Sequence, residues 1–159
     1  TGHITEDPVL RDLMMEKREA KLQLAGREIP DTVKFNYFGA RSAETVLVSW
    51  GSTKGPILDA LDRLVAEKES VGFLQMRLLN PFPSEAIMTY LAKAKRRVDI
   101  EMNFSAQLGG LIRERTGVDP THVIVKYNGR PMSNNEVYDA VKAVIHGKAA
   151  HRTVLTHGA

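Results

Sequence analysis

Between residues 45 and 145 the sequence alternates four times between a short apolar run and a segment with apolar residues at helical spacing. The runs are dense in Val and Ile and mostly apolar on both faces, which favours strands covered by helices on both sides. They are TVLVSW (45–50), VGFLQM (71–76), RVDIEM (97–102) and HVIVKY (122–127). Strands that alternate with helices in this way pair in parallel through helical crossovers. The pattern therefore predicts a three-layer αβα sandwich.

A further strand is predicted ahead of these units. The segment VKFNYF (33–38) alternates in polarity, with Val33, Phe35 and Tyr37 on one face. We place it at the edge of the sheet as an antiparallel addition. The fold prediction is an α/β three-layer sandwich whose mostly parallel five-stranded sheet has one antiparallel edge strand.

The chain divides into three predicted parts. Residues 1–42 form an N-terminal helix and a connector, residues 43–147 form the sandwich domain, and residues 148–159 form a tail without a clear period. No internal repeat or low-complexity segment interrupts them. A chain of 159 residues with 43% hydrophobic residues is long and apolar enough for one such domain with an appendage.

Helix boundaries are marked by capping residues at both ends of the chain. Asp7 followed by Pro8 favours a helix start, and Gly26 favours the end of that helix. Ser133 and Glu136 have the spacing of a capping box, which predicts the start of the last helix.

Composition excludes several classes of site. The chain has no cysteine, so it supplies no disulfide, no thiolate ligand for zinc or iron–sulfur clusters, and no thiol nucleophile. The 22 basic and 19 acidic residues are intermixed, which favours an ordinary solvated surface over nucleic-acid binding. The histidines show no metal-ligand spacing, and no apolar run has the ~18 residues that span a bilayer. We expect a cytoplasmic chain without a metal site and without a membrane partner.

The turn GSTKG (51–55) joins the first regular strand to the helix that begins near Pro56. A helix N-terminus with two hydroxyls and a lysine suits an anion, so Ser52, Thr53 and Lys54 are candidate contacts to a phosphate or carboxylate. The turn matches neither the phosphate-loop motif nor the dinucleotide fingerprint. The simpler interpretation is a structural corner in which Ser52 or Thr53 caps the helix.

Polar residues also follow two later strands. Because ligands of such sheets lie outside the carboxyl ends of the strands, Glu101, Asn103, Ser105 and Gln107 are expected to face the same crevice as the GSTKG turn. Glu101 is a candidate general base, although a structural carboxylate is the simpler interpretation. Asn103, Ser105 and Gln107, together with Arg130 in the turn KYNGRPM, are candidate contacts to a partner protein.

Gly109 and Gly110 lie inside a predicted helix, where each glycine costs about 1 kcal/mol relative to alanine. We expect a close approach of this helix to the sheet or to another chain to require them.

Four of these corner sequences together resemble the C-terminal part of the alpha subunit of 2-oxoacid:ferredoxin oxidoreductases. The likeness runs in order over about residues 44–146, and the leading DPVLRDLMMEKREAKL is similar to the helix that leaves the preceding pyrimidine-binding domain in that family. The four segments are VLVSWGSTKGPILDALDRL, VGFLQMRLLNPFP, VDIEMNFSAQLGGLIRERTG and VKYNGRPM.

The resemblance implies a transketolase C-terminal-like fold. It also implies an enzyme that decarboxylates a 2-oxoacid on thiamine diphosphate with Mg²⁺, passes electrons through a [4Fe-4S] cluster to ferredoxin, and transfers the acyl group to coenzyme A. The thiamine-binding and cluster motifs of the family are absent from this sequence, so the cofactors belong to the beta subunit and the remainder of the alpha subunit. This chain is then a structural and subunit-contact part without catalytic residues, inactive alone.

Two other functions remain open from the residues. One is a free-standing nucleotide- or coenzyme-A-binding α/β module that uses the GSTKG turn. The other is a nucleic-acid-binding protein, which the positive net charge of +3 suggests only weakly. The sequence does not indicate which 2-oxoacid is used or what the oligomeric state is.

Overall fold

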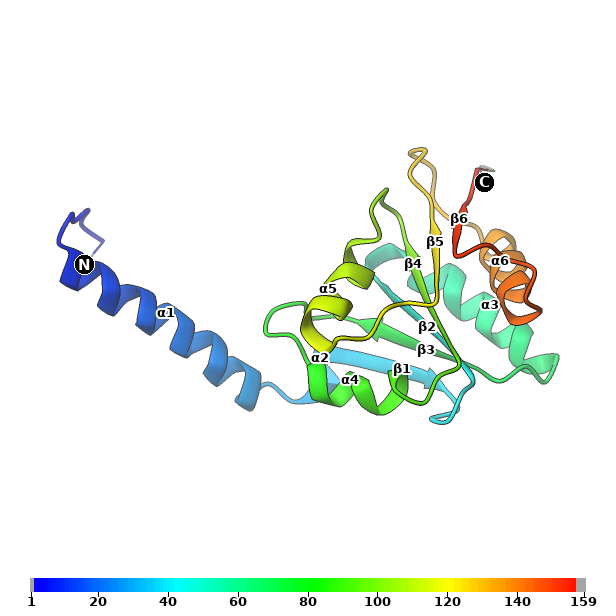
Figure 1. Ribbon diagram of the computed structural model, residues 1–159, viewed down its shortest axis with the longest axis horizontal. Coiled ribbons are helices and arrows are strands. Elements are labelled where there is room, and N and C mark those ends of the chain that lie inside the picture. The colour runs from blue at the N-terminus through cyan, green and yellow to red at the C-terminus, as the bar shows by residue number, and fades with distance from the viewer. Residues whose placement is uncertain (1, 157–159) are drawn as a thin grey trace.

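The computed structural model describes residues 2–156 and contains one sheet between two layers of helices (Figure 1). The six strands are β1 (Phe35–Gly39), β2 (Thr45–Trp50), β3 (Val71–Met76), β4 (Arg96–Glu101), β5 (His122–Val125) and β6 (Arg152–Val154). Their order across the sheet is β1-β3-β2-β4-β5-β6, and all neighbours are parallel except β1 with β3. The predicted αβα sandwich and its antiparallel edge strand are confirmed.

The sheet has six strands where the sequence predicted five. The additional strand β6 lies in the predicted tail 148–159 and pairs in parallel with β5, with Val123 opposite Arg152. The prediction of a tail without a regular element was wrong. A strand of three residues is too short to show a period in the sequence. Residues 157–159 lie outside the described residues. The predicted connector and the predicted tail thus each contribute one strand to the same sheet as the central domain.

Two pairs of helices bury the two faces of the sheet. On one face lie α3 (Lys54–Ala66) and α6 (Asn134–Ile145), which pack on Leu47, Phe73 and Ile124. On the other face lie α4 (Ser84–Leu91) and α5 (Gln107–Thr116), which pack on Val48 and Leu74. Side chains of β2 alternate between these two clusters, because successive strand residues point to opposite faces.

The first helix, α1 (Pro8–Glu28), projects away from the sandwich (Figure 1). As predicted, Asp7 caps it, since the Asp7 carboxylate accepts hydrogen bonds from Val9 N and Leu10 N. The predicted end at Gly26 is wrong, because the helix runs on to Glu28 and stops ahead of Pro30, which disfavours helical backbone in the residue before it.

A short helix α2 (Asp31–Lys34) precedes β1, so the edge strand starts two residues later than predicted. Val33 therefore lies in a helical turn rather than on the strand. The turn is held by Lys34, whose buried ammonium donates to Gly26 O at 2.9 Å and to the Asp31 carboxylate at 3.1 Å.

The glycine pair in α5 has one member with a close neighbour and one without. A Cβ added to Gly109 would lie 2.5 Å from Asp99 Oδ2 and 3.2 Å from Pro120 Cγ. A Cβ added to Gly110 would meet nothing within 4 Å. The predicted close approach of this helix to the sheet is confirmed at Gly109.

Gly110→Ala should therefore stabilise the chain by up to about 1 kcal/mol, because alanine is the better helix former and has room. Gly109→Ala should destabilise it, since the same gain is outweighed by overlap with the buried Asp99 carboxyl. Urea unfolding of the two variants measures both effects. Equal shifts in the two variants would contradict the packing argument.

Candidate functional site

A crevice of about 350 Å³ lies at the carboxyl ends of β2 and β4. The chain leaves β2 for β3 on one side and later returns to β4 on the other, so β2 and β4 flank the point where the strand order reverses. Sheets of this kind bind ligands at that point. We call this the carboxyl-edge crevice, and its lining residues are Trp50, Gly51, Ser52, Thr53, Met102, Asn103 and Gln107.

The turn after β2 forms one wall of the crevice. Gly51 has a φ of +70°, a conformation that glycine adopts without strain, and it begins the short 3-10 helix Gly51–Thr53. The buried Thr53 hydroxyl bonds to Trp50 O at 2.9 Å and to Ser49 Oγ, and no side chain caps α3. The predicted cap by Ser52 or Thr53 is therefore wrong, because the Thr53 hydroxyl closes the preceding turn instead.

The three candidate anion contacts point in different directions. Ser52 lines the crevice and is exposed, while the Thr53 hydroxyl is already bonded within the turn. The Lys54 ammonium lies 5.6 Å from the centre of the Phe38 ring and is not among the groups that line the crevice. The geometry therefore brings Ser52 to the crevice without the positive charge that would attract an anion.

Glu101 lies beneath the crevice as a fully buried carboxylate. Oε2 accepts from Trp50 Nε1 at 2.8 Å and from Asn103 Nδ2 at 2.7 Å, and Oε1 accepts from Leu108 N at 2.7 Å. Both oxygens are thus occupied by donors of the protein itself. Glu101 positions the Trp50 indole and the first turn of α5, as the structural interpretation of its sequence position predicted.

Asp99 lies two residues before Glu101 on β4, on the same face of the sheet. Its Oδ2 accepts from Gly109 N at 3.0 Å, whereas its buried Oδ1 has no hydrogen-bond partner among residues 2–156. Burial, followed by the charge of Glu101, raises the pKa of Asp99 to about 9. The two carboxyl groups together fasten the start of α5 to the sheet.

The candidate partner contacts separate into two groups. Asn103 and Gln107 line the crevice, whereas Ser105 is exposed beside it. Arg130 is exposed in the loop between β5 and α6, which stands out at the same end of the sheet (Figure 1). That loop is held by Lys126, whose fully buried ammonium donates to Pro131 O at 2.8 Å and to both Glu136 oxygens.

An exposed apolar rim surrounds this end of the sheet, which the sequence reasoning did not identify. Phe104 is 67% exposed, and its ring meets the Tyr127 ring edge-on at 5.0 Å between centroids. The available signal was one or two large apolar residues at or just past each of three strand ends. The carboxyl-edge rim consists of Trp50, Met102, Phe104 and Tyr127.

The described residues offer no ligand group for the metal ions among the cofactors that the resemblance implies. Within residues 2–156 no three His, Asp or Glu side chains form a group that would hold a metal ion. The sequence has no cysteine for an iron–sulfur cluster. No helix in the same range is long and apolar enough to cross a membrane.

Comparison with known proteins decides the family. The family model described as pyruvate:ferredoxin oxidoreductase core domain II matches residues 43–137. The chain belongs to this family. Two curated relatives are similar over 99% of the chain: a 2-oxoacid:ferredoxin oxidoreductase subunit alpha of Saccharolobus solfataricus, 39% identical, and a 2-oxoacid:ferredoxin oxidoreductase 2, subunit alpha, of Aeropyrum pernix, 42% identical. The resemblance of the four corner sequences to these alpha subunits is confirmed.

A solved structure supports the same assignment. The 2-oxoglutarate:ferredoxin oxidoreductase from Magnetococcus marinus, solved with 2-oxoglutarate, coenzyme A and succinyl-CoA bound, matches 91% of this chain and 25% of its own chain. The TM-score is 0.78 and the sequence identity 29%. The chain spans about a quarter of the length of the curated relatives and of this structure.

Proposed function

We propose that this chain is the core-domain-II part of the alpha subunit of a cytoplasmic 2-oxoacid:ferredoxin oxidoreductase. The complete enzyme decarboxylates a 2-oxoacid oxidatively, forms an acyl-CoA and reduces ferredoxin. Thiamine diphosphate, Mg²⁺ and a [4Fe-4S] cluster are held by the beta subunit and the remainder of the alpha subunit. The part described here provides contact surface and no catalytic residue.

The observation that carries this proposal is the extent of the match. Similarity to alpha subunits covers 99% of this chain but only 24% of the relatives' length. The crevice adds to it, because no carboxylate lines it among the described residues, and Glu101 beneath it is buried and fully hydrogen-bonded.

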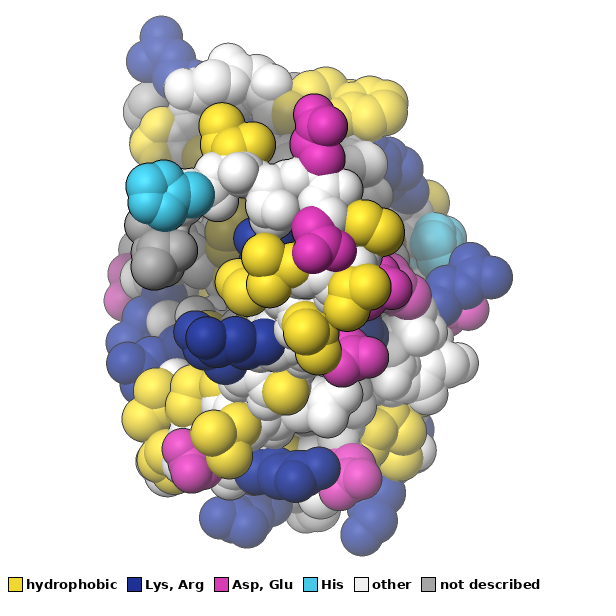
Figure 2. Space-filling model, turned by 90° about the vertical axis from the view of Figure 1, so that its left-hand side faces the viewer, with side chains coloured by type: hydrophobic (Ala, Val, Ile, Leu, Met, Phe, Trp, Pro, Cys, Tyr) yellow, Lys and Arg dark blue, Asp and Glu magenta, His cyan; other side chains and the backbone are white. Residues whose placement is uncertain are grey.

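The uncovered helix α1 also favours a place in a larger assembly. None of its residues is buried, and Figure 2, seen from the end where α1 lies, shows hydrophobic side chains among charged ones. An isolated helix gains little stability in water, so packing on a partner is the usual source of it. We propose the remainder of the alpha subunit as that partner. The exposed large apolar residues of α1 are Val9, Leu10, Leu13, Met14, Met15, Leu22 and Leu24.

The carboxyl-edge rim is the second proposed contact. Exposed aromatic and Arg side chains are typical of residues that dominate protein interfaces, and Phe104, Tyr127 and Arg130 lie at one end of the sheet. Asn103, Ser105 and Gln107 would supply polar contacts beside them. Ser52, Thr53 and Lys54 remain the proposed contacts to an anionic group. Of these three, Ser52 has the exposed hydroxyl that lines the crevice.

The test uses the purified chain and the complete enzyme in parallel. The chain alone should show no turnover of a 2-oxoacid and should not retain thiamine diphosphate through gel filtration.

In the complete enzyme, Phe104→Asp should weaken association of the subunits or domains at least about tenfold, because a buried charge replaces an aromatic contact. The turnover number per intact complex should stay unchanged, since no catalytic group is altered.

Val65→Asp is the matched control, because Val65 is a 50% exposed apolar residue on α3, away from the rim. Analytical ultracentrifugation measures association and ferredoxin reduction measures turnover. The proposal is wrong if the isolated chain is active or if Phe104→Asp lowers turnover in fully assembled enzyme.

A further inference from the structure

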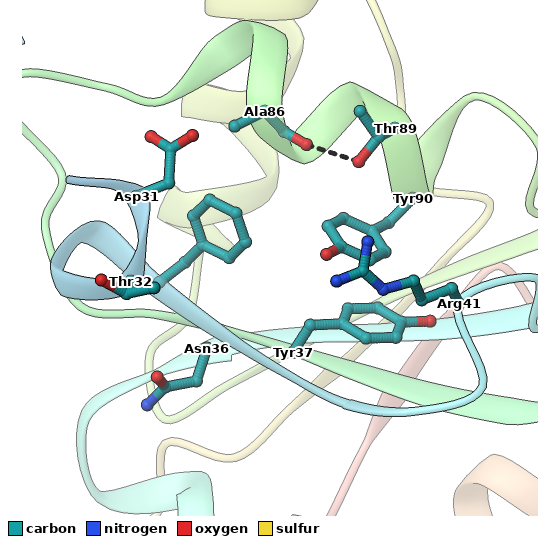
Figure 3. A pocket seen from close by; sticks show the side chains of 9 residues that line it. Asp31, Thr32, Asn36, Tyr37, Arg41, Ala86, Thr89 and Tyr90 are labelled. Carbon is teal, nitrogen blue, oxygen red and sulfur yellow. Dashed lines mark hydrogen bonds between the residues drawn. The ribbon is translucent and has the colours of Figure 1, made fainter. Parts of the chain in front are cut away.

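A second hollow, of about 430 Å³, lies between the edge strand β1 and helix α4 (Figure 3). It is separate from the carboxyl-edge crevice, and the two share no lining residue. We call it the edge-strand hollow. Its lining residues are Asp31, Thr32, Phe35, Asn36, Tyr37, Arg41, Ala86, Thr89 and Tyr90.

Three aromatic rings form the apolar part of this hollow. Tyr37 and Tyr90 stack with centroids 3.9 Å apart, and Phe35 meets Tyr90 edge-on at 6.1 Å. The Tyr37 hydroxyl donates to Ala40 O at 2.9 Å, and a Cβ on Gly72 of β3 would overlap that hydroxyl. The hydrogen bond therefore fixes the position of the Tyr37 ring, and the absence of a side chain at Gly72 leaves room for it.

The charge of the hollow comes from one arginine. Figure 3 shows Arg41 reaching toward the rings of Tyr37 and Tyr90. Across residues 2–156 no carboxylate lies within ion-pairing distance of its guanidinium. Asp31, the only carboxylate of the lining, is paired with Lys34 at 3.1 Å, and its charge is thereby offset. Burial, followed by Tyr90, raises the pKa of Tyr37 to about 12, so its hydroxyl adds no negative charge at neutral pH.

We propose that the edge-strand hollow binds a small aromatic carboxylate. The volume is in the range of small-molecule sites, which combine an apolar lining with a few polar groups that fix orientation. The ring of the ligand packs among Phe35, Tyr37 and Tyr90, where edge-on aromatic contacts are favourable. Its carboxylate pairs with the Arg41 guanidinium, whose planar fork matches a carboxylate.

The test is a titration of the full chain with 3-phenylpropionate, up to about 10 mM, followed by backbone amide chemical shifts in NMR. Shifts should be saturable and confined to residues around Arg41, Ala86 and Tyr90. The uncharged analogue 3-phenyl-1-propanol and the ring-free analogue propionate should each bind at least about tenfold more weakly, since each lacks one of the two contacts.

Arg41→Gln should weaken binding of 3-phenylpropionate by a similar factor, whereas Arg11→Gln, an exposed arginine on α1, should leave it unchanged. Equal binding of the acid and the alcohol by the unaltered chain would overturn the proposal, and so would the absence of saturable shifts at the hollow. The comparison of ligands needs no variant, so the proposal stays testable even if Arg41→Gln folds poorly.

Discussion

Glu136→Gln should lower the free energy of unfolding by about 3–5 kcal/mol, because it leaves a buried charge without its partner. The Lys126 ammonium is fully buried, and both Glu136 oxygens lie 2.8–2.9 Å from it. Gln keeps an oxygen that can accept from Ser133 N, as Glu136 Oε2 does at 2.9 Å, so the helix cap survives. The loss therefore reports the charge, and urea unfolding at neutral pH measures it.

Glu44→Gln provides the matched control. Glu44 pairs with Lys95 at 2.6 Å, but both side chains are largely exposed, so a much smaller loss is expected. The double variant Lys126→Met with Glu136→Gln should lose less stability than the sum of the single variants, since neither charge is then left alone in the interior. Equal losses for Glu136→Gln and Glu44→Gln would contradict the role given to burial.

Asp99→Asn should stabilise the chain increasingly as pH rises from about 5 to about 8. Burial, followed by the nearby Glu101, raises the pKa of Asp99 in the folded chain to about 9, from 3.8. Between these values the folded chain holds a proton that the unfolded chain has released, so the stability of the natural chain falls as pH rises, by at most about 1.4 kcal/mol per pH unit. Asn carries no titrating proton, and this slope disappears.

The two chains should be similar in stability near pH 3, where Asp99 is mostly neutral in both states, and the variant should lead by at most about 6 kcal/mol at pH 8. Urea unfolding at several pH values measures the difference. Asp62→Asn, an exposed position on α3, should follow the natural chain at every pH. Parallel curves for the natural chain and Asp99→Asn would show that Asp99 is already ionised when folded.

The candidate site was only partly predictable from residues near one another in the chain. The sequence placed Ser52, Asn103 and Gln107 at strand ends, and the structure brings all three to the carboxyl-edge crevice. The sequence did not show that the Lys54 side chain points away from the crevice, because its direction depends on Phe38 of the edge strand. It also left the role of Glu101 open, since the donors Trp50 and Leu108 come from another strand and from a helix.

Patterns in the amino-acid sequence were enough to predict the layers, the four central strands, the capping box at Ser133 and, through four corner sequences, the family. These are local signals, because hydrophobic period and capping chemistry act over a few residues. The burial of Asp99, the sixth strand and the edge-strand hollow became visible in the folded chain alone. Each arises from groups that meet in space but lie far apart in the chain, as Tyr37 and Tyr90 do, and no local pattern encodes such a meeting.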